Sequence, residues 1–120
     1  MREFYFERLD IWKDARSFIK DIYLLTDEFP SQEKYGIISQ IRRASLSVSV
    51  NIAEGISRST NKEKARFINL AYGSAIEVIN FLIIAKDLSL IAEIQYLELR
   101  EKCEKITNGL NSLYKKLINM

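Results

Sequence analysis

Residues that break helices are nearly missing from this chain. Its 120 residues include one proline, Pro30, and four glycines, Gly36, Gly55, Gly73 and Gly109. Sheet proteins need many tight turns, and such turns depend on glycine, proline or Asn-Gly pairs. The scarcity of turn residues therefore predicts long helices with few connections. The length fits one domain, residues 1–120.

Apolar residues recur at spacings of three and four, as expected for helices with one buried face. Pro30 ends the first helix, and Ser31 is suited to cap the second. Thr60 followed by Glu63 forms a capping-box pattern at the start of the third. Because short links between long helices favour antiparallel neighbours, we predict an all-α, up-down-up-down four-helix bundle. The helices are expected at residues 9–29, 32–56, 61–88 and 92–118.

The third predicted helix is apolar on nearly all sides between Ala75 and Ala85. A helix in an isolated four-helix bundle presents one face to the core, so a helix apolar on several faces needs a second partner. Neighbouring helices of the same chain cover part of this surface, but small bundles rarely surround one helix completely. The pattern therefore predicts a homo-oligomer.

Positive charge is concentrated in the middle of the chain. Residues 1–33 carry five basic and eight acidic side chains, and residues 34–66 carry seven basic and two acidic. Cations around the turn between the second and third helices share one end of the bundle, where they suit phosphate binding by counterion release. An ordinary solvated end explains the same pattern. The candidate nucleic-acid-binding residues are Arg42, Arg43, Arg58, Lys62, Lys64 and Arg66.

A polar stripe runs along the second predicted helix, opposite its core face. A small apolar strip, Leu46, Val50 and Ala53, lies beside it. Polar groups next to apolar ones on an outer face suit a subunit interface. A solvated face with i,i+4 ion pairs is the alternative. The stripe consists of Gln40, Arg43, Ser47, Asn51, Glu54 and Arg58.

The chemistry of most enzymes is missing from this sequence. It contains no histidine, no Gly-rich phosphate loop and no zinc-ligand spacing. Glu54, Glu63 and Glu77 are the carboxylates considered for magnesium, and each has a structural explanation instead. We expect no enzyme, no cofactor and no metal. Cys103 falls on a heptad seam and is predicted to be a core residue.

The sequence is typical of a cytoplasmic protein without a membrane partner. A single cysteine excludes an internal disulfide and favours a reducing compartment. The charged N-terminal segment lacks the apolar run of a signal peptide. The longest apolar run, Val78–Ala85, is too short to span a bilayer.

Five segments spread over nearly the whole chain form a combined pattern. They are Leu9–Ala15, Ser39–Ala44, Asn51–Gly55, Lys62–Phe67, and Ala71–Ser74 leading to Glu77. Together they resemble the four-helix-bundle proteins encoded in intervening sequences of bacterial 23S ribosomal RNA genes. That family usually has a proline where this chain has Ser49. A proline would bend the second helix, so no such bend is expected here.

The resemblance implies a homopentameric barrel of four-helix bundles with a role in binding RNA. A related branch, the accessory proteins of diversity-generating retroelements, binds nucleic acid and a reverse transcriptase through a basic surface. Two hypotheses follow for this chain. The first is an oligomeric RNA-binding protein, and the second is a protein-interaction scaffold or accessory subunit for a nucleic-acid enzyme such as a reverse transcriptase.

Overall fold

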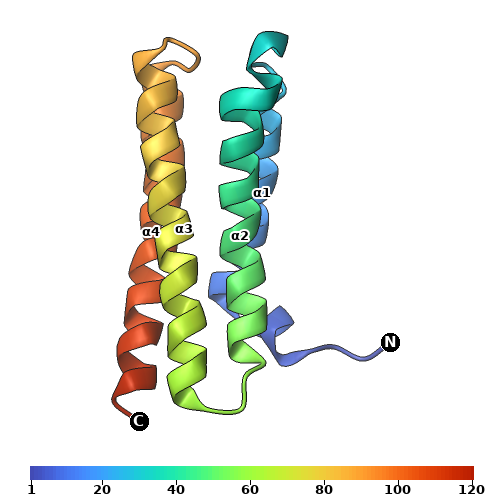
Figure 1. The fold of residues 1–120 in the computed structure, drawn as a ribbon, viewed down its shortest axis with the longest axis vertical. Helices are drawn as coiled ribbons and strands as arrows, with labels where there is room; N and C mark the ends of the chain where they lie inside the picture. The colour runs from blue at the N-terminus through green and yellow to red at the C-terminus, as the bar shows by residue number, and fades with distance from the viewer.

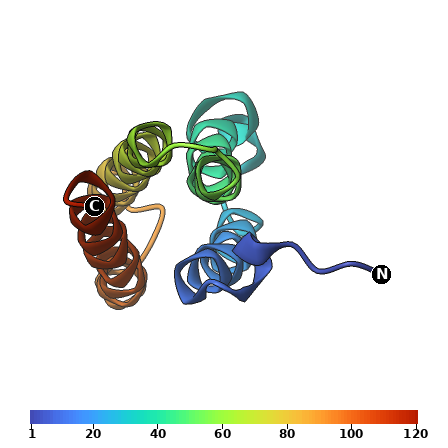
Figure 2. The ribbon, with the colours of Figure 1, turned by 90° about the horizontal axis from the view of Figure 1, so that it is seen from below.

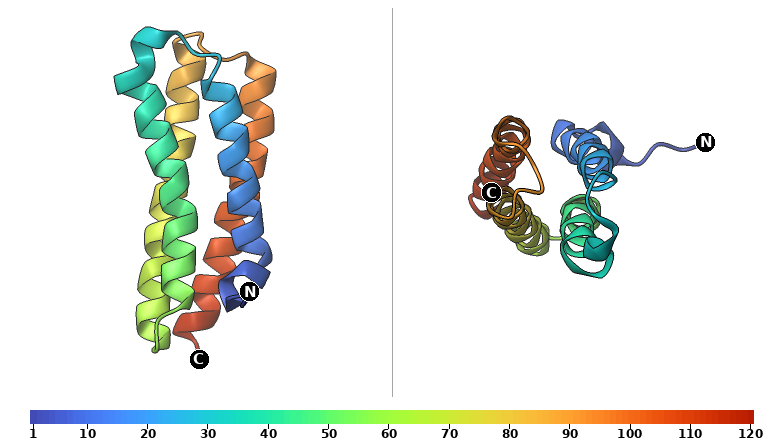
Figure 3. Two further views of the ribbon diagram at one scale, coloured as in Figure 1. Left: turned by 90° about the vertical axis from the view of Figure 1, so that its right-hand side faces the viewer. Right: turned by 90° about the horizontal axis from the view of Figure 1, so that it is seen from above.

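The computed structural model describes residues 1–120 and consists of four long helices without a strand (Figure 1). Neighbouring helices run antiparallel, and both termini lie at the same end as the α2–α3 turn (Figure 3). This arrangement confirms the predicted all-α, up-down-up-down four-helix bundle. The long helices are α1 Asp10–Thr26, α2 Ser39–Ile56, α3 Asn61–Asp87 and α4 Glu93–Ile118.

One hydrophobic core runs along the bundle and draws residues from all four helices. Ile22, Ile52, Leu82 and Leu110 contribute one fully buried side chain from each. The inward face of α3 also carries several alanines, which let its neighbours approach closely. Cys103 lies in this core, as the heptad seam predicts.

The N-terminal half is less regular than the sequence predicts. A short 3₁₀ helix, Tyr5–Arg8 (η1), precedes α1, and α1 ends at Thr26 rather than near residue 29. A second 3₁₀ helix, Ser31–Glu33 (η2), and a π-helical segment, Lys34–Ile38 (η3), stand where α2 was expected to begin. The predicted start of α2 at residue 32 is therefore wrong.

Gly36 explains the late start of α2. Its backbone is non-helical, with φ −106° and ψ −115°, and this interrupts the helical path three residues before Ser39. Glycine lacks a Cβ atom and therefore adopts backbone conformations that other residues avoid, which permits such a break. Ser31 makes no side-chain cap, contrary to the prediction. From Ser39 onward α2 is continuous through Ser49, as expected without a proline.

The start of α3 follows the predicted cap in part. The backbone N–H of Glu63 donates to Thr60 Oγ1 over 3.2 Å, which satisfies one free donor of the first turn. The Glu63 carboxylate, however, accepts from Arg66 instead of returning to the cap residue. Thr60 is thus the N-cap, while the reciprocal half of the capping box is absent.

A close contact holds α2 against α3 near the turn that joins them. Gly55 is buried, and a Cβ atom added there would lie 2.6 Å from Phe67 Cβ and 3.4 Å from the Lys64 carbonyl oxygen. A separation of 2.6 Å is below van der Waals contact, so only glycine fits at this position. The α2–α3 spacing at this end therefore depends on Gly55.

Over an 18-residue window, α3 is long and apolar enough to cross a membrane by length and composition alone. The apolar character of α3 extends beyond Val78–Ala85, so the length of that run underestimates how much of the helix is apolar. A core helix passes the same test, and α3 packs between α2 and α4 (Figure 2). Its outer side nevertheless leaves Leu70, Ile76 and Ile84 exposed.

Substituting Gly55 with alanine is expected to destabilise the fold. The added methyl group has to push α3 away, and such overpacking lowers the free energy of unfolding by about 1–3 kcal/mol. Gly73→Ala is the matched control, since an added Cβ there meets no atom within 4 Å. The control should gain about 0.5–1 kcal/mol of helix propensity. Urea unfolding followed by circular dichroism measures both, and equal effects would contradict the close-contact explanation.

Candidate functional site

Two arginines meet at the α2–α3 corner, on either side of the turn in sequence. Arg58 follows the end of α2, and Arg66 lies in the second turn of α3. Their guanidinium carbons lie 4.9 and 4.6 Å from the centre of the Phe67 ring, which attracts both cations. The two guanidinium groups are therefore within 9.5 Å of each other. The Gly55 contact positions this ring, and so it positions both arginines.

Each of these arginines also has an acidic neighbour. Arg66 donates to Glu63 over 3.0 Å, and Arg58 lies 4.0 Å from Glu54. The hydrogen bond from Arg66 holds the pKa of the Glu63 carboxyl below its usual value, and that carboxylate in turn raises the pKa of Arg66. Both groups stay charged at neutral pH. The exposed donors of the two arginines remain available to a further anion.

Four lysines at this end of the bundle form no ion pair. None of the ion pairs in the chain includes Lys62, Lys64, Lys115 or Lys116. Lys115 and Lys116 belong to the last turn of α4, which ends beside the first turns of α3 (Figure 2). The sequence alone does not reveal that these two lysines share an end of the bundle with the corner, because they lie some fifty residues away from it in the chain.

The two ends of the bundle carry opposite charge. We call residues 56–66 and 113–120 the basic end, and they hold six basic side chains and one acidic. At the other end, residues 27–35 and 86–93 hold five acidic side chains and two basic. A net charge of only +2 therefore conceals a bundle with strong polarity along its axis.

Arg42 and Arg43 do not join the basic end. They precede Arg58 by about four helical turns, which corresponds to roughly 22–24 Å along α2. Arg42 is half-buried and donates to Thr26 Oγ1 over 2.8 Å and to Asp27 over 2.9 Å. These contacts bind α2 to the end of α1. Arg42 is therefore a structural residue of the α1–α2 pair, and the structure does not gather the six predicted cations into one patch.

Two residues of the polar stripe of α2 form a seam with α3. Arg43 pairs with Glu77 of α3 over 2.6 Å, and Ser47 accepts a hydrogen bond from Ser74 of α3 over 2.9 Å. Asn51 donates to Ser47 over 3.1 Å. The middle of the predicted subunit interface is thus engaged by α3 of the same chain. Gln40 accepts from Arg43, and Glu54 and Arg58 continue the stripe to the basic end.

The apolar strip beside this seam stays uncovered. Leu46 and Val50 point away from the core with 41% and 49% of their surface exposed. They share this property with Leu70, Ile76 and Ile84 on the outer side of α3. Adjacent helices α2 and α3 therefore both present apolar side chains to solvent.

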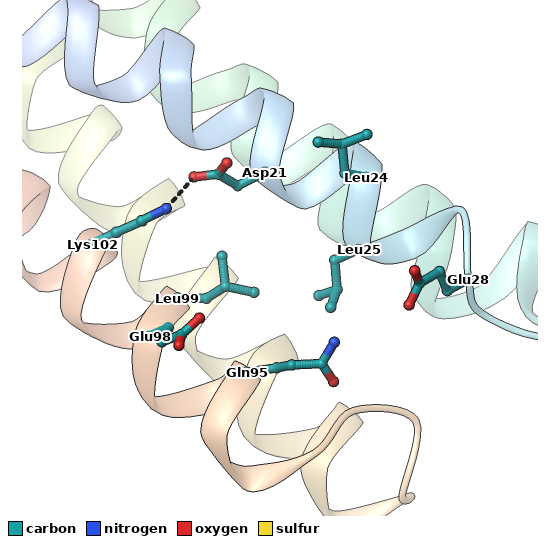
Figure 4. A pocket seen from close by; sticks show the side chains of 8 residues that line it. All are labelled: Asp21, Leu24, Leu25, Glu28, Gln95, Glu98, Leu99 and Lys102. Carbon is teal, nitrogen blue, oxygen red and sulfur yellow. Dashed lines mark hydrogen bonds and ion pairs between the residues drawn. The ribbon is translucent and has the colours of Figure 1, made fainter.

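A groove between α1 and α4 encloses about 270 Å³ (Figure 4). Its floor contains Leu25 and Leu99, and its rim carries the carboxylates of Asp21, Glu28 and Glu98. Lys102 is the one cation in the lining, and it pairs with Asp21 over 2.9 Å. The acidic rim repels phosphate, so this groove is unsuited to nucleic acid.

The three carboxylates considered for magnesium do not form one cluster. Glu54, Glu63 and Glu77 each lie beside a different arginine. No group of three or more Asp, Glu or Cys side chains is placed to hold a metal ion.

Cys103 is unsuited to act as a nucleophile. Its thiol is buried in the core and contacts the Ala75 carbonyl oxygen over 3.5 Å. Burial raises its pKa from 9.0 to about 12, because the thiolate loses its hydration there. The nucleophilic thiolate form is therefore absent at neutral pH.

Native protein is expected to resist thiol reagents at pH 8 and to react fully in urea. Because the raised pKa disfavours the thiolate only in the folded state, the thiol stabilises the fold below pH 9. That contribution is lost as the pH rises from 9 towards 12. Urea unfolding of wild type and Cys103→Ala across this range measures the loss. Rapid labelling of native protein would contradict the buried position.

Comparisons with known proteins agree with the fold. A crystal structure of a protein of unknown function from the S23 ribosomal protein family of Bacteroides thetaiotaomicron superposes with a TM-score of 0.79. The two chains are 22% identical, and the match covers 88% of this chain and 98% of the other. No curated protein sequence matches the chain. The family model for 23S rRNA-intervening sequence proteins matches residues 7–112. The chain therefore belongs to the 23S rRNA-intervening sequence protein family.

Proposed function

We propose that this protein is a non-enzymatic, cytoplasmic, homo-oligomeric bundle that binds RNA through its basic end. The observation that carries the proposal is the separation of charge between the two ends of the bundle. The basic end holds four lysines that form no ion pair and two arginines that lie against one phenylalanine ring. Such a surface attracts phosphates through counterion release and needs no base-specific contact.

Oligomer formation is supported by the exposed apolar side chains of α2 and α3. Leu46, Val50, Leu70, Ile76 and Ile84 are each between 38% and 49% exposed. Association removes such side chains from water, which stabilises the complex. The family resemblance implies a pentamer, and a symmetric assembly multiplies the basic end into a ring of like charge.

A protein scaffold or accessory subunit for a nucleic-acid enzyme is the alternative. It is favoured by Ile94 and Leu97 on α4, which are 66% and 55% exposed and lie on another helix than the apolar strips of α2 and α3. A partner such as a reverse transcriptase would then cover α4. This alternative predicts weak RNA binding by the protein alone.

RNA binding tests the role of the basic end. Lys62→Ala combined with Lys115→Ala removes two unpaired cations there, while Lys20→Ala combined with Lys34→Ala removes two from elsewhere on the chain. Only the first pair is expected to weaken binding. For this pair, the slope of log affinity against log salt concentration should also become less steep by about one to two. This change is the contribution of two phosphate contacts. Fluorescence anisotropy with labelled RNA across a salt series measures both effects.

Equal effects of the two lysine pairs would show that the attraction is a property of the whole surface. Absence of RNA binding by the wild type at low salt would reject the RNA role and favour the scaffold. Lysines are chosen over Arg58 and Arg66 because those arginines pack on Phe67, so their removal also changes the fold locally.

The mass of the protein in solution tests whether the exposed side of α3 forms a subunit interface. The wild type is expected to be a multimer, and Ile76→Glu combined with Ile84→Glu is expected to dissociate it, because burying two carboxylates opposes association. Multi-angle light scattering gives the mass, and circular dichroism checks that the helices persist. Leu24→Glu on α1, diagonally opposite α3 in the bundle (Figure 2), is the control. A monomeric wild type would contradict the proposal.

A further inference from the structure

A cavity at the basic end has the lining of a nucleotide site. It encloses about 400 Å³ between the first turns of α3 and the end of α4. Lys62 and Arg66 supply cations, Asn61 supplies an amide, and Tyr114 supplies an aromatic ring. Ala65 and Leu117, which are buried, and Ile118 and Met120, which are exposed, form the aliphatic part of the lining. Ligand pockets of several hundred cubic ångströms with an apolar lining and a few polar groups are typical of small-molecule sites.

The aromatic rings at this end have different surroundings. Phe67 already lies beside the guanidinium groups of Arg58 and Arg66. The ring of Tyr114 is half-buried, lines the cavity, and has no cation of the chain over it. A flat apolar ring beside positive side chains is the combination that binds an unstacked base together with its phosphate.

We infer that this cavity binds a nucleotide of single-stranded RNA, with its base against Tyr114 and its phosphate at Lys62 and Arg66. The inference rests on the proposed function and specifies its substrate class. In a duplex the bases are paired and stacked, so they cannot enter a cavity, whereas bases in loops and single strands are free to do so. The acidic groove between α1 and α4 offers no comparable place, since its rim repels phosphate.

The test compares two substitutions at one position. Tyr114→Leu keeps an apolar side chain on the core but removes the aromatic face, and Tyr114→Phe keeps the ring. Both are measured by anisotropy against a labelled ten-nucleotide single-stranded RNA and an RNA duplex of the same length, at low salt. The wild type should prefer the single strand. Tyr114→Leu should lower affinity for the single strand by about five- to tenfold, because one base stack is lost.

Affinity for the duplex should be the same in all three proteins, and Tyr114→Phe should behave as the wild type. Circular dichroism and urea unfolding show whether Tyr114→Leu is folded. If it is not, Lys62→Glu is used in its place, because this substitution leaves the core intact. Lys62→Glu should weaken single-strand binding more than duplex binding. Equal binding of both RNAs with no effect of the substitutions would overturn the nucleotide site but leave the phosphate-binding role. Failure of the wild type to bind either RNA would overturn both.

Discussion

The contact between Gly55 and Phe67 holds α2 and α3 together at the basic end of the bundle. It brings the last turn of α2 within van der Waals distance of α3, where any side chain at position 55 would collide. The same ring then receives Arg58 from one side of the turn and Arg66 from the other. One packing constraint thus sets both the spacing of two helices and the position of two cations.

Charge is distributed along the bundle rather than around it. Antiparallel topology returns the end of α4 to the start of α3, so Lys115 and Lys116 lie at the same end of the bundle as the cations of the α2–α3 turn. The same topology collects acidic residues at the other end. A linear charge profile shows only the first of these groups, because residues 67–120 taken together hold six acidic and six basic side chains. The polarity of the molecule is therefore a consequence of how its helices are connected.

The seam between α2 and α3 shows why a polar stripe on one helix is ambiguous. Arg43 and Ser47 have the spacing of an outward-facing stripe, yet they bind Glu77 and Ser74 of the neighbouring helix. Periodicity identifies a helix face but not the element that covers it. Arg42 illustrates the same limit, since its bonds to Thr26 and Asp27 depend on where α1 ends.

The sequence by itself determined the helical class, the number of helices, the turn at the α2–α3 corner and the buried position of Cys103. These features depend on local signals: few glycines and prolines, a 3.6-residue period, and a cap at Thr60. Only the tertiary structure decided which cations share a surface, that Gly36 delays α2, and that Tyr114 lines a cavity with Lys62. Each of these depends on contacts between residues far apart in the chain or on a backbone break, and a pattern of neighbouring residues does not encode them.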